Sequence, residues 1–89
     1  MTNELLDRVR RVVALNLRQK PEHVGVDSTF DDLGMDSLDS MHLLFALESE
    51  FDVSIEDVDA KSIRSVREAA EGVAKLLASK AKNANITRR

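Results

Sequence analysis

Residues 30–40 read FDDLGMDSLDS and mark the junction between a long loop and a helix. Gly34 ends the loop, as glycine commonly does at such boundaries. From Asp36 to Phe51 apolar residues recur at helical spacing, which predicts a helix of about 16 residues, or roughly 24 Å. Ser37 therefore falls in the first turn of this helix, and Asp36 is a plausible N-cap that leaves the serine free to point outward.

The predicted helix 36–51 has two apolar faces. With residues placed about 100° apart, one face is wide enough to be the core face; it comprises Leu43, Leu44, Leu47 and Phe51. A second stripe at i, i+3 and i+7 consists of Leu38, Met41 and Phe45, called the apolar strip below. A small bundle can hardly bury both faces, so we predict that the apolar strip, with Glu48 and Asp52 at its acidic margin, docks a partner. A neighbouring loop that covers the strip is the alternative.

Other helices are expected on either side of this junction. Apolar spacing predicts a first helix over about 3–18, which Pro21 cannot extend. The loop 19–35 that follows has four apolar anchors for the core: Val24, Val26, Phe30 and Leu33. A short acidic segment predicts a small helix around 56–61.

A last helix is predicted over about 66–80, beginning with a capping box in which Ser65 and Glu68 bond to each other's backbone. Residues 82–89, KNANITRR, have no periodicity. We therefore predict an all-α four-helix bundle of three main helices and one short one. It would form a domain over residues 1–82, with a flexible basic tail at 83–89.

Length and composition exclude several classes of protein. The 89 residues, 43% of them apolar, suit one domain with an aliphatic core. The absence of cysteine excludes disulfides, thiolate metal sites and thiol nucleophiles. No apolar run approaches the roughly 20 residues of a membrane span, and the first residues do not resemble a signal peptide. We expect a cytoplasmic monomer.

The net charge of −3 hides a segregation of charge. Residues 27–59 contain eleven acids and no lysine or arginine, whereas residues 1–26 and 60–89 are both more basic than acidic. Nucleic acid is therefore an improbable partner for the middle of the chain. A field of one sign steers oppositely charged proteins, so we expect partners with basic docking surfaces. A merely solvated acidic face is the alternative.

FDDLGMDSLDS, the loop before it, the ALESEF segment at 46–51 and the short acidic helix together resemble the acyl carrier protein family over about residues 3–80. The resemblance implies that Ser37 carries 4′-phosphopantetheine, transferred from coenzyme A by a separate phosphopantetheinyl transferase. The thiol of that group would hold acyl intermediates as thioesters and present them to acyl-transferring and acyl-modifying enzymes. The resemblance also implies that Asp36 and Asp39 help the transferase to organise its metal and basic surface. Alternatively, these two acids only favour the helix dipole.

The chemistry around Ser37 agrees with a carrier rather than an enzyme. An anion attached to Ser37 would lie beside the free N–H groups and positive dipole end of the helix. No base stands next to the serine, and His42 lies about 140° around a regular helix, so a serine hydrolase is disfavoured. Two alternatives stay open: Ser37 as a simple helix cap, and a helical interaction module without a prosthetic group.

Four residues depart from the pattern of housekeeping fatty-acid carriers: Met35, His42, Ser49 and Asp52. Two interpretations therefore stay open. One is a fatty-acid carrier, and the other is a specialised carrier for a polyketide, a modified lipid or another acyl or aminoacyl product.

Overall fold

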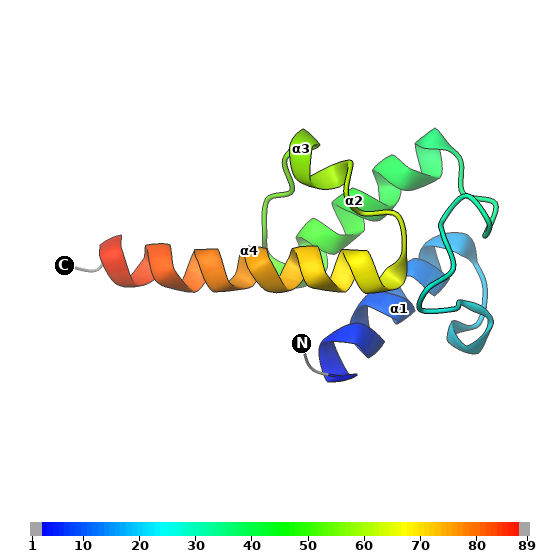
Figure 1. Ribbon diagram of the computed structural model, residues 1–89, viewed down its shortest axis with the longest axis horizontal. Coiled ribbons are helices and arrows are strands. Elements are labelled where there is room, and N and C mark those ends of the chain that lie inside the picture. The colour runs from blue at the N-terminus through cyan, green and yellow to red at the C-terminus, as the bar shows by residue number, and fades with distance from the viewer. Residues whose placement is uncertain (1–2, 88–89) are drawn as a thin grey trace.

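The computed structural model describes residues 3–87, with side chains from 4 to 80. These residues form four α-helices and one short 3-10 helix, and no strand ladder (Figure 1). The elements in order are α1 (Asn3–Leu17), η1 (Pro21–His23), α2 (Ser37–Phe51), α3 (Asp57–Ala60) and α4 (Val66–Thr87). The predicted all-α fold with three main helices and one short helix is confirmed.

An aliphatic core holds the three long helices together. α1 packs against both α2 and α4. The largest fully buried side chains come from all three helices and from the loop after η1: Leu43, Leu47, Val9, Val13, Val24, Val66 and Val73. Burying a large aliphatic side chain stabilises the fold by about 1.5–3 kcal/mol, so this cluster is the main source of stability.

The loop before α2 is held down at several points. Val24 and Phe30 are buried as predicted, and Val26 and Leu33 are partly buried. Met35 is also buried, which the sequence reading did not predict. The backbone N–H of Met35 donates to the carbonyl of Phe30 at 3.0 Å, and this turn directs the methionine inward.

The same loop pairs with the beginning of α4. Thr29 and Ser65 form an isolated antiparallel bridge, and the Phe30 N–H donates to the Arg64 carbonyl at 2.7 Å. The Arg67 N–H donates to the carbonyl of Val26 at 3.0 Å. The segment that leads into α2 is therefore fixed to α4, although the two are far apart in sequence.

α4 is longer than predicted. It ends at Thr87 rather than near residue 80, so the predicted domain boundary at 82 falls within a helix. Residues 78–87 contain neither glycine nor proline, and alanine, the best helix former, recurs in them. The predicted tail lacks an apolar face, but helix propensity alone continues the helix. Figure 1 shows α4 projecting beyond the other helices.

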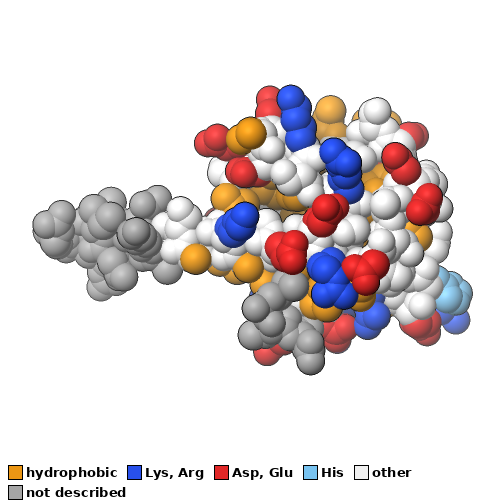
Figure 2. Space-filling model, viewed as in Figure 1, with side chains coloured by type: hydrophobic (Ala, Val, Ile, Leu, Met, Phe, Trp, Pro, Cys, Tyr) orange, Lys and Arg blue, Asp and Glu red, His pale blue; other side chains and the backbone are white. Residues whose placement is uncertain are grey.

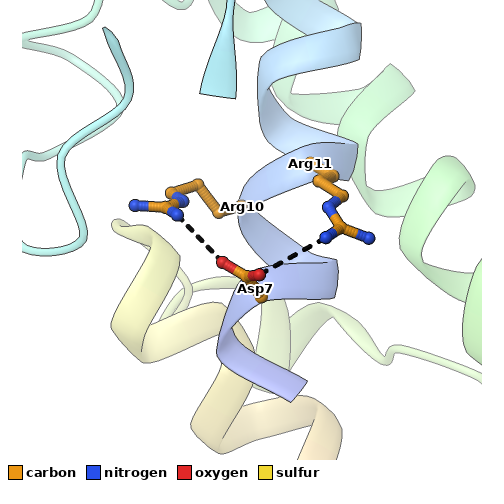
Figure 3. Close-up of polar contacts among 3 residues, drawn as sticks. All are labelled: Asp7, Arg10 and Arg11. Carbon is orange, nitrogen blue, oxygen red and sulfur yellow. Dashed lines mark hydrogen bonds and ion pairs between the residues drawn. The ribbon is translucent and has the colours of Figure 1, made fainter. Parts of the chain in front are cut away.

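Ion pairs link the helices at the surface. Arg8 of α1 bonds Glu50 of α2 at 2.9 Å, and its guanidinium lies 4.6 Å from the centre of the Phe51 ring. Within α1, Asp7 lies between Arg10 and Arg11 and contacts both (Figure 3). Each of these solvent-accessible pairs contributes little stability, but they neutralise charge locally. On the face shown in Figure 2, acidic and basic side chains are interspersed over the bundle.

No helix among residues 3–87 is long and apolar enough to cross a membrane.

Candidate functional site at the start of α2

The start of α2 is closed by a capping box of two aspartates. Asp36 is the N-cap: its Oδ1 accepts from the Asp39 N–H at 2.8 Å, while Asp39 Oδ2 accepts from the Asp36 N–H at 3.3 Å. The side chain of Asn16 in α1 donates to the Asp39 carbonyl at 3.0 Å. The first turn of α2 is thus fixed by its own carboxylates and anchored to α1.

Ser37 has no part in this cap. It is the first residue of α2 and is exposed, and no hydrogen bond between described residues uses its hydroxyl. The prediction that Asp36 caps the helix and leaves Ser37 outward is confirmed. Neither the Ser37 N–H nor the Leu38 N–H is used by the capping box.

A phosphodiester on this serine would fit the site. The two first-turn N–H groups left by the cap, together with the positive end of the helix dipole, favour an anion there. The exposed hydroxyl can be reached by a second protein. The neighbouring aspartates disfavour a free anion, so the site suits a phosphate that is attached covalently better than one that binds reversibly.

The two faces of α2 separate as predicted. Leu43, Leu47 and Phe51 are buried, and Leu44 is partly buried. In the apolar strip, Leu38 is 59% exposed, Met41 51% and Phe45 60%. No described loop covers the strip, so that alternative is wrong. His42 is exposed on the same helix.

Glu48 has a structural contact that the sequence reading missed. Its Oε2 accepts from the backbone N–H of Ile55 at 2.7 Å, which ties α2 to the segment before α3. Nearby, Asp52 ends α2 in the left-handed conformation with φ of 53°. Lys80 of α4 donates to both the carbonyl and the carboxylate of Asp52. A contact between residues 48 and 55 depends on how the chain turns after the helix, so helical periodicity could not reveal it.

Part of the acidic charge is neutralised. Three of the eleven acids, Asp27, Glu50 and Asp52, form salt bridges with arginine or lysine among the described residues. The hydrogen bond from Arg67 holds the pKa of Asp27 below its usual value, and that from Lys80 does the same for the pKa of Asp52.

Three acids just before Ser37 in the chain have no ion-pair partner among the described residues. Asp31, Asp32 and Asp36 are exposed, and none of them bonds a described cation. The start of α2 therefore keeps the negative field that the sequence predicts.

One turn beyond Ser37, Ser40 lines a pocket of about 150 Å³ between α2 and the segment that joins α3 to α4. The lining residues are Phe30, Ser40, Leu43, Leu44, Ala60, Lys61, Ile63 and Arg64. A second pocket, of about 260 Å³, shares Phe30, Ser40, Ile63 and Arg64 with the first, so the two adjoin. Sequence spacing could not predict this depression, because it depends on how the loop and segment 60–64 pack.

Comparisons with known proteins agree with this geometry. A family model for the phosphopantetheine attachment site matches residues 7–73. An acyl carrier protein of Cyanidium caldarium is 48% identical over 69 residues, which are 76% of this chain and 80% of the relative. An acyl carrier protein of Caulobacter vibrioides is 43% identical over 70 residues, which are 78% of this chain and 90% of the relative.

Solved structures have the same fold. The solution structure of a holo acyl carrier protein from Geobacter metallireducens superposes with a TM-score of 0.75, at 22% identity, over 86% of this chain and 90% of that one. A chain in the structure named "The ishigamide ketosynthase/chain length factor" gives a TM-score of 0.68, at 29% identity, over 84% of this chain and 96% of that one.

Proposed function

The chain belongs to the acyl carrier protein family, and from this premise we propose that Ser37 is the residue that carries its 4′-phosphopantetheine. Members of this family carry acyl groups and do not catalyse their conversion. The observation that carries the proposal is the capping box. Because Asp36 and Asp39 cap α2 by themselves, the Ser37 hydroxyl is left exposed and makes no hydrogen bond to a described residue.

Attachment would make Ser37 Oγ the new partner of a phosphorus atom of coenzyme A, while the adenosine bisphosphate portion leaves. The chain places no base beside the hydroxyl, so we expect the transferase to take up the serine proton. Bound phosphopantetheine supplies the thiol that holds an acyl group as a thioester, which this cysteine-free chain cannot supply. The protein's own residues position the attachment point and present it on a rigid helix.

We further propose that the apolar strip and the acids beside it form the docking surface for partner enzymes. The apolar strip is exposed, and no ion pair with a described residue neutralises the charges of Asp31 and Asp36. The expected partners are a phosphopantetheinyl transferase and acyl-transferring or acyl-modifying enzymes with basic surfaces, in the cytoplasm. Fatty-acid or polyketide biosynthesis is the setting that the relatives support. Asp39 and Glu48 would contribute charge, although one oxygen of each is used inside the fold.

The attachment residue is tested by incubating the protein with coenzyme A and a broad-specificity phosphopantetheinyl transferase. Intact mass should show one added phosphopantetheine, and peptide mapping should place it on Ser37. Ser37→Ala should lose the modification completely and keep its helical circular dichroism. Modification at Ser28 or Ser40, or none at all in the wild type, would refute the proposal.

The docking surface is tested by comparing the two faces of α2. Met41→Ala and Phe45→Ala should weaken transferase binding while changing the melting temperature little, because both side chains are half exposed or more. Leu47→Ala and Phe51→Ala should lower the free energy of unfolding by about 2–5 kcal/mol. If Phe45→Ala destabilises the protein as much as Phe51→Ala, the strip belongs to the core and is no docking surface.

The same mass measurement addresses the alternative of a helical interaction module. A chain that binds the transferase through the strip but is never modified would be such a module. The free Ser37 hydroxyl favours the carrier.

A further inference from the structure

We propose that α1 carries a second docking surface, which fits a partner protein that presents an apolar side chain beside carboxylates. Its residues are Val12, Leu15 and Arg18, called the α1 face below. The inference goes beyond the proposed function, because it concerns a different helix and does not depend on attachment at Ser37. It gives this chain a contact of opposite charge from the one proposed for α2.

Leu15 is the centre of the α1 face. Its side chain is 81% exposed, more than that of any residue in the apolar strip. Val12 precedes it by three positions and therefore shares its side of the helix. Both residues line a groove of about 400 Å³ between α1 and Glu50 of α2. A single exposed leucine is ordinary, but this one borders a groove that can accept an apolar side chain.

The acids that line the groove leave little negative charge beside Leu15. Two of them, Asp7 and Glu50, form ion pairs with arginines of α1. The third, Glu4, stands about three helical turns before Leu15.

The part of α1 around Leu15 is basic. Residues 8–21 contain five bases and no acid. Arg18 and Lys20 are exposed, and neither forms an ion pair with a described residue. Cations without partners beside an exposed leucine are complementary to a surface where carboxylates surround an apolar side chain.

Arg18 occupies a backbone position that usually belongs to glycine. It follows the last residue of α1 and has a φ of 57°, and its N–H donates to the Leu15 carbonyl at 3.2 Å. Helices commonly end with glycine in this left-handed conformation, because a Cβ there costs energy. No ion pair with a described residue offsets this cost, and strained residues of this kind cluster at functional sites. A contact outside the chain accounts for the arginine.

Two surfaces of opposite charge would select among partners. The start of α2 carries acids without ion-pair partners, whereas the α1 face carries a cation. A uniformly basic partner is attracted to α2 and repelled by the α1 face. A partner that covers both must be basic where it meets α2 and acidic where it meets α1.

The experiment uses two synthetic amphipathic peptides of equal length and identical leucine content, one with glutamate and the other with lysine on the polar side. Each is titrated into the full-length chain while amide chemical shifts are recorded. We expect the glutamate peptide to shift the amides of the α1 face, and added salt to weaken its binding. The lysine peptide should shift the amides of the apolar strip instead. It tests the α2 surface, so failure of either proposal is seen separately.

Leu15→Ala should weaken binding of the glutamate peptide about fivefold, which corresponds to about 1 kcal/mol. Val58→Ala is the matched control and should leave the affinity unchanged. Val58 is 69% exposed, but it stands between Asp57 and Asp59, which repel the glutamate peptide.

Two substitutions of Arg18 separate its charge from its backbone strain. Arg18→Gln and Arg18→Gly both remove the cation, and each should weaken binding of the glutamate peptide by about 1.4-fold to 5-fold, as for an exposed ion pair. Only Arg18→Gly also relieves the strain, so it alone should raise the melting temperature. Lys75→Gln, at an exposed lysine of α4, is the control and should change neither quantity.

Four outcomes would overturn the inference. The glutamate peptide could fail to shift the α1 face, or its binding could survive Leu15→Ala unchanged. Oligothymidylate or phosphatidylglycerol vesicles could shift the same amides as strongly, which would make the face a general site for polyanions. These amides could also move when the chain alone is diluted, which would mean that a second copy of the chain occupies the face.

Discussion

α2 and α4 each begin beside a serine, but the two serines have opposite surroundings. Ser65 is only 6% exposed, and its Oγ accepts from the Glu68 N–H at 3.2 Å to cap α4. Ser37 is exposed, and an aspartate caps α2 in its place. The same residue type is thus structural at one helix start and chemically available at the other.

The comparison shows that a free hydroxyl at a helix start requires another residue to supply the cap. The N–H groups of a first turn need acceptors, and serine is a preferred one. Asp36 fills this requirement for α2, which releases Ser37. At α4 the serine itself is needed, and the bridge to Thr29 buries it.

The largest stability difference should be between the two serine-to-alanine variants. Ser65→Ala should lower the free energy of unfolding by roughly 1 kcal/mol through loss of the cap. Ser37→Ala should change it by less than about 0.5 kcal/mol, as for other surface substitutions. Urea denaturation measures both values. Equal losses would mean that Ser37 has a structural contact and that the contrast between the two helix starts is false.

A smaller effect should separate the two helix starts in acid. Among the described residues, an ion pair joins the loop to α4 and none joins it to α2. Arg67 lowers the pKa of Asp27 in the folded protein. The stability from this pair is therefore complete above the unfolded pKa of about 3.9 and is lost as pH falls through the lower folded pKa. The stability difference between wild type and Asp27→Asn should be constant near neutral pH and shrink below about pH 4.

Asp31→Asn is the control for this measurement, because no ion pair joins Asp31 to a described residue. Thermal melts across this pH range would show the difference. An Asp27→Asn effect that persists unchanged at pH 2 would assign the contribution to something other than the ion pair.

The smallest effect expected concerns the field around the start of α2. His42→Glu adds negative charge to the exposed side of this helix, whereas the start of α4 carries Arg64 and Arg67. Loading of the holo protein by a fatty-acid synthase malonyl transferase should become roughly twofold faster at low salt. An unchanged rate would show that His42 does not distinguish the partners of this carrier.

The features that sequence alone predicted are local ones. Helical spacing identified α1 and α2 and separated Leu47 from Phe45, because the period of a helix determines which side chains share a face. The Asp36 cap was predictable because aspartate is a preferred N-cap residue, and its partner lies only three positions further along the chain. The predicted capping box at the start of α4 was only half confirmed. Ser65 accepts from the Glu68 N–H as predicted, but Glu68 accepts from the Arg64 N–H and not from the Ser65 N–H.

The features that sequence could not predict depend on packing between distant segments. Met35 is buried because the loop turns back on itself after Phe30. The Lys61 and Arg64 side of the pocket arises where segment 60–64 meets α2. The length of α4 was missed for a different reason. The prediction ended the helix where its apolar face ends, but helix propensity continues the helix beyond that point.

The projection of α4 also determines how this protein can be attached to a solid support. In Figure 1 the far end of α4 and the start of α2 lie at opposite ends of the molecule. A tag or chip linkage placed after Thr87 would therefore leave Ser37 facing the solution. Immobilisation through Lys61 would instead obstruct the pocket that this residue lines, so the choice of linkage decides what a surface-binding assay can detect.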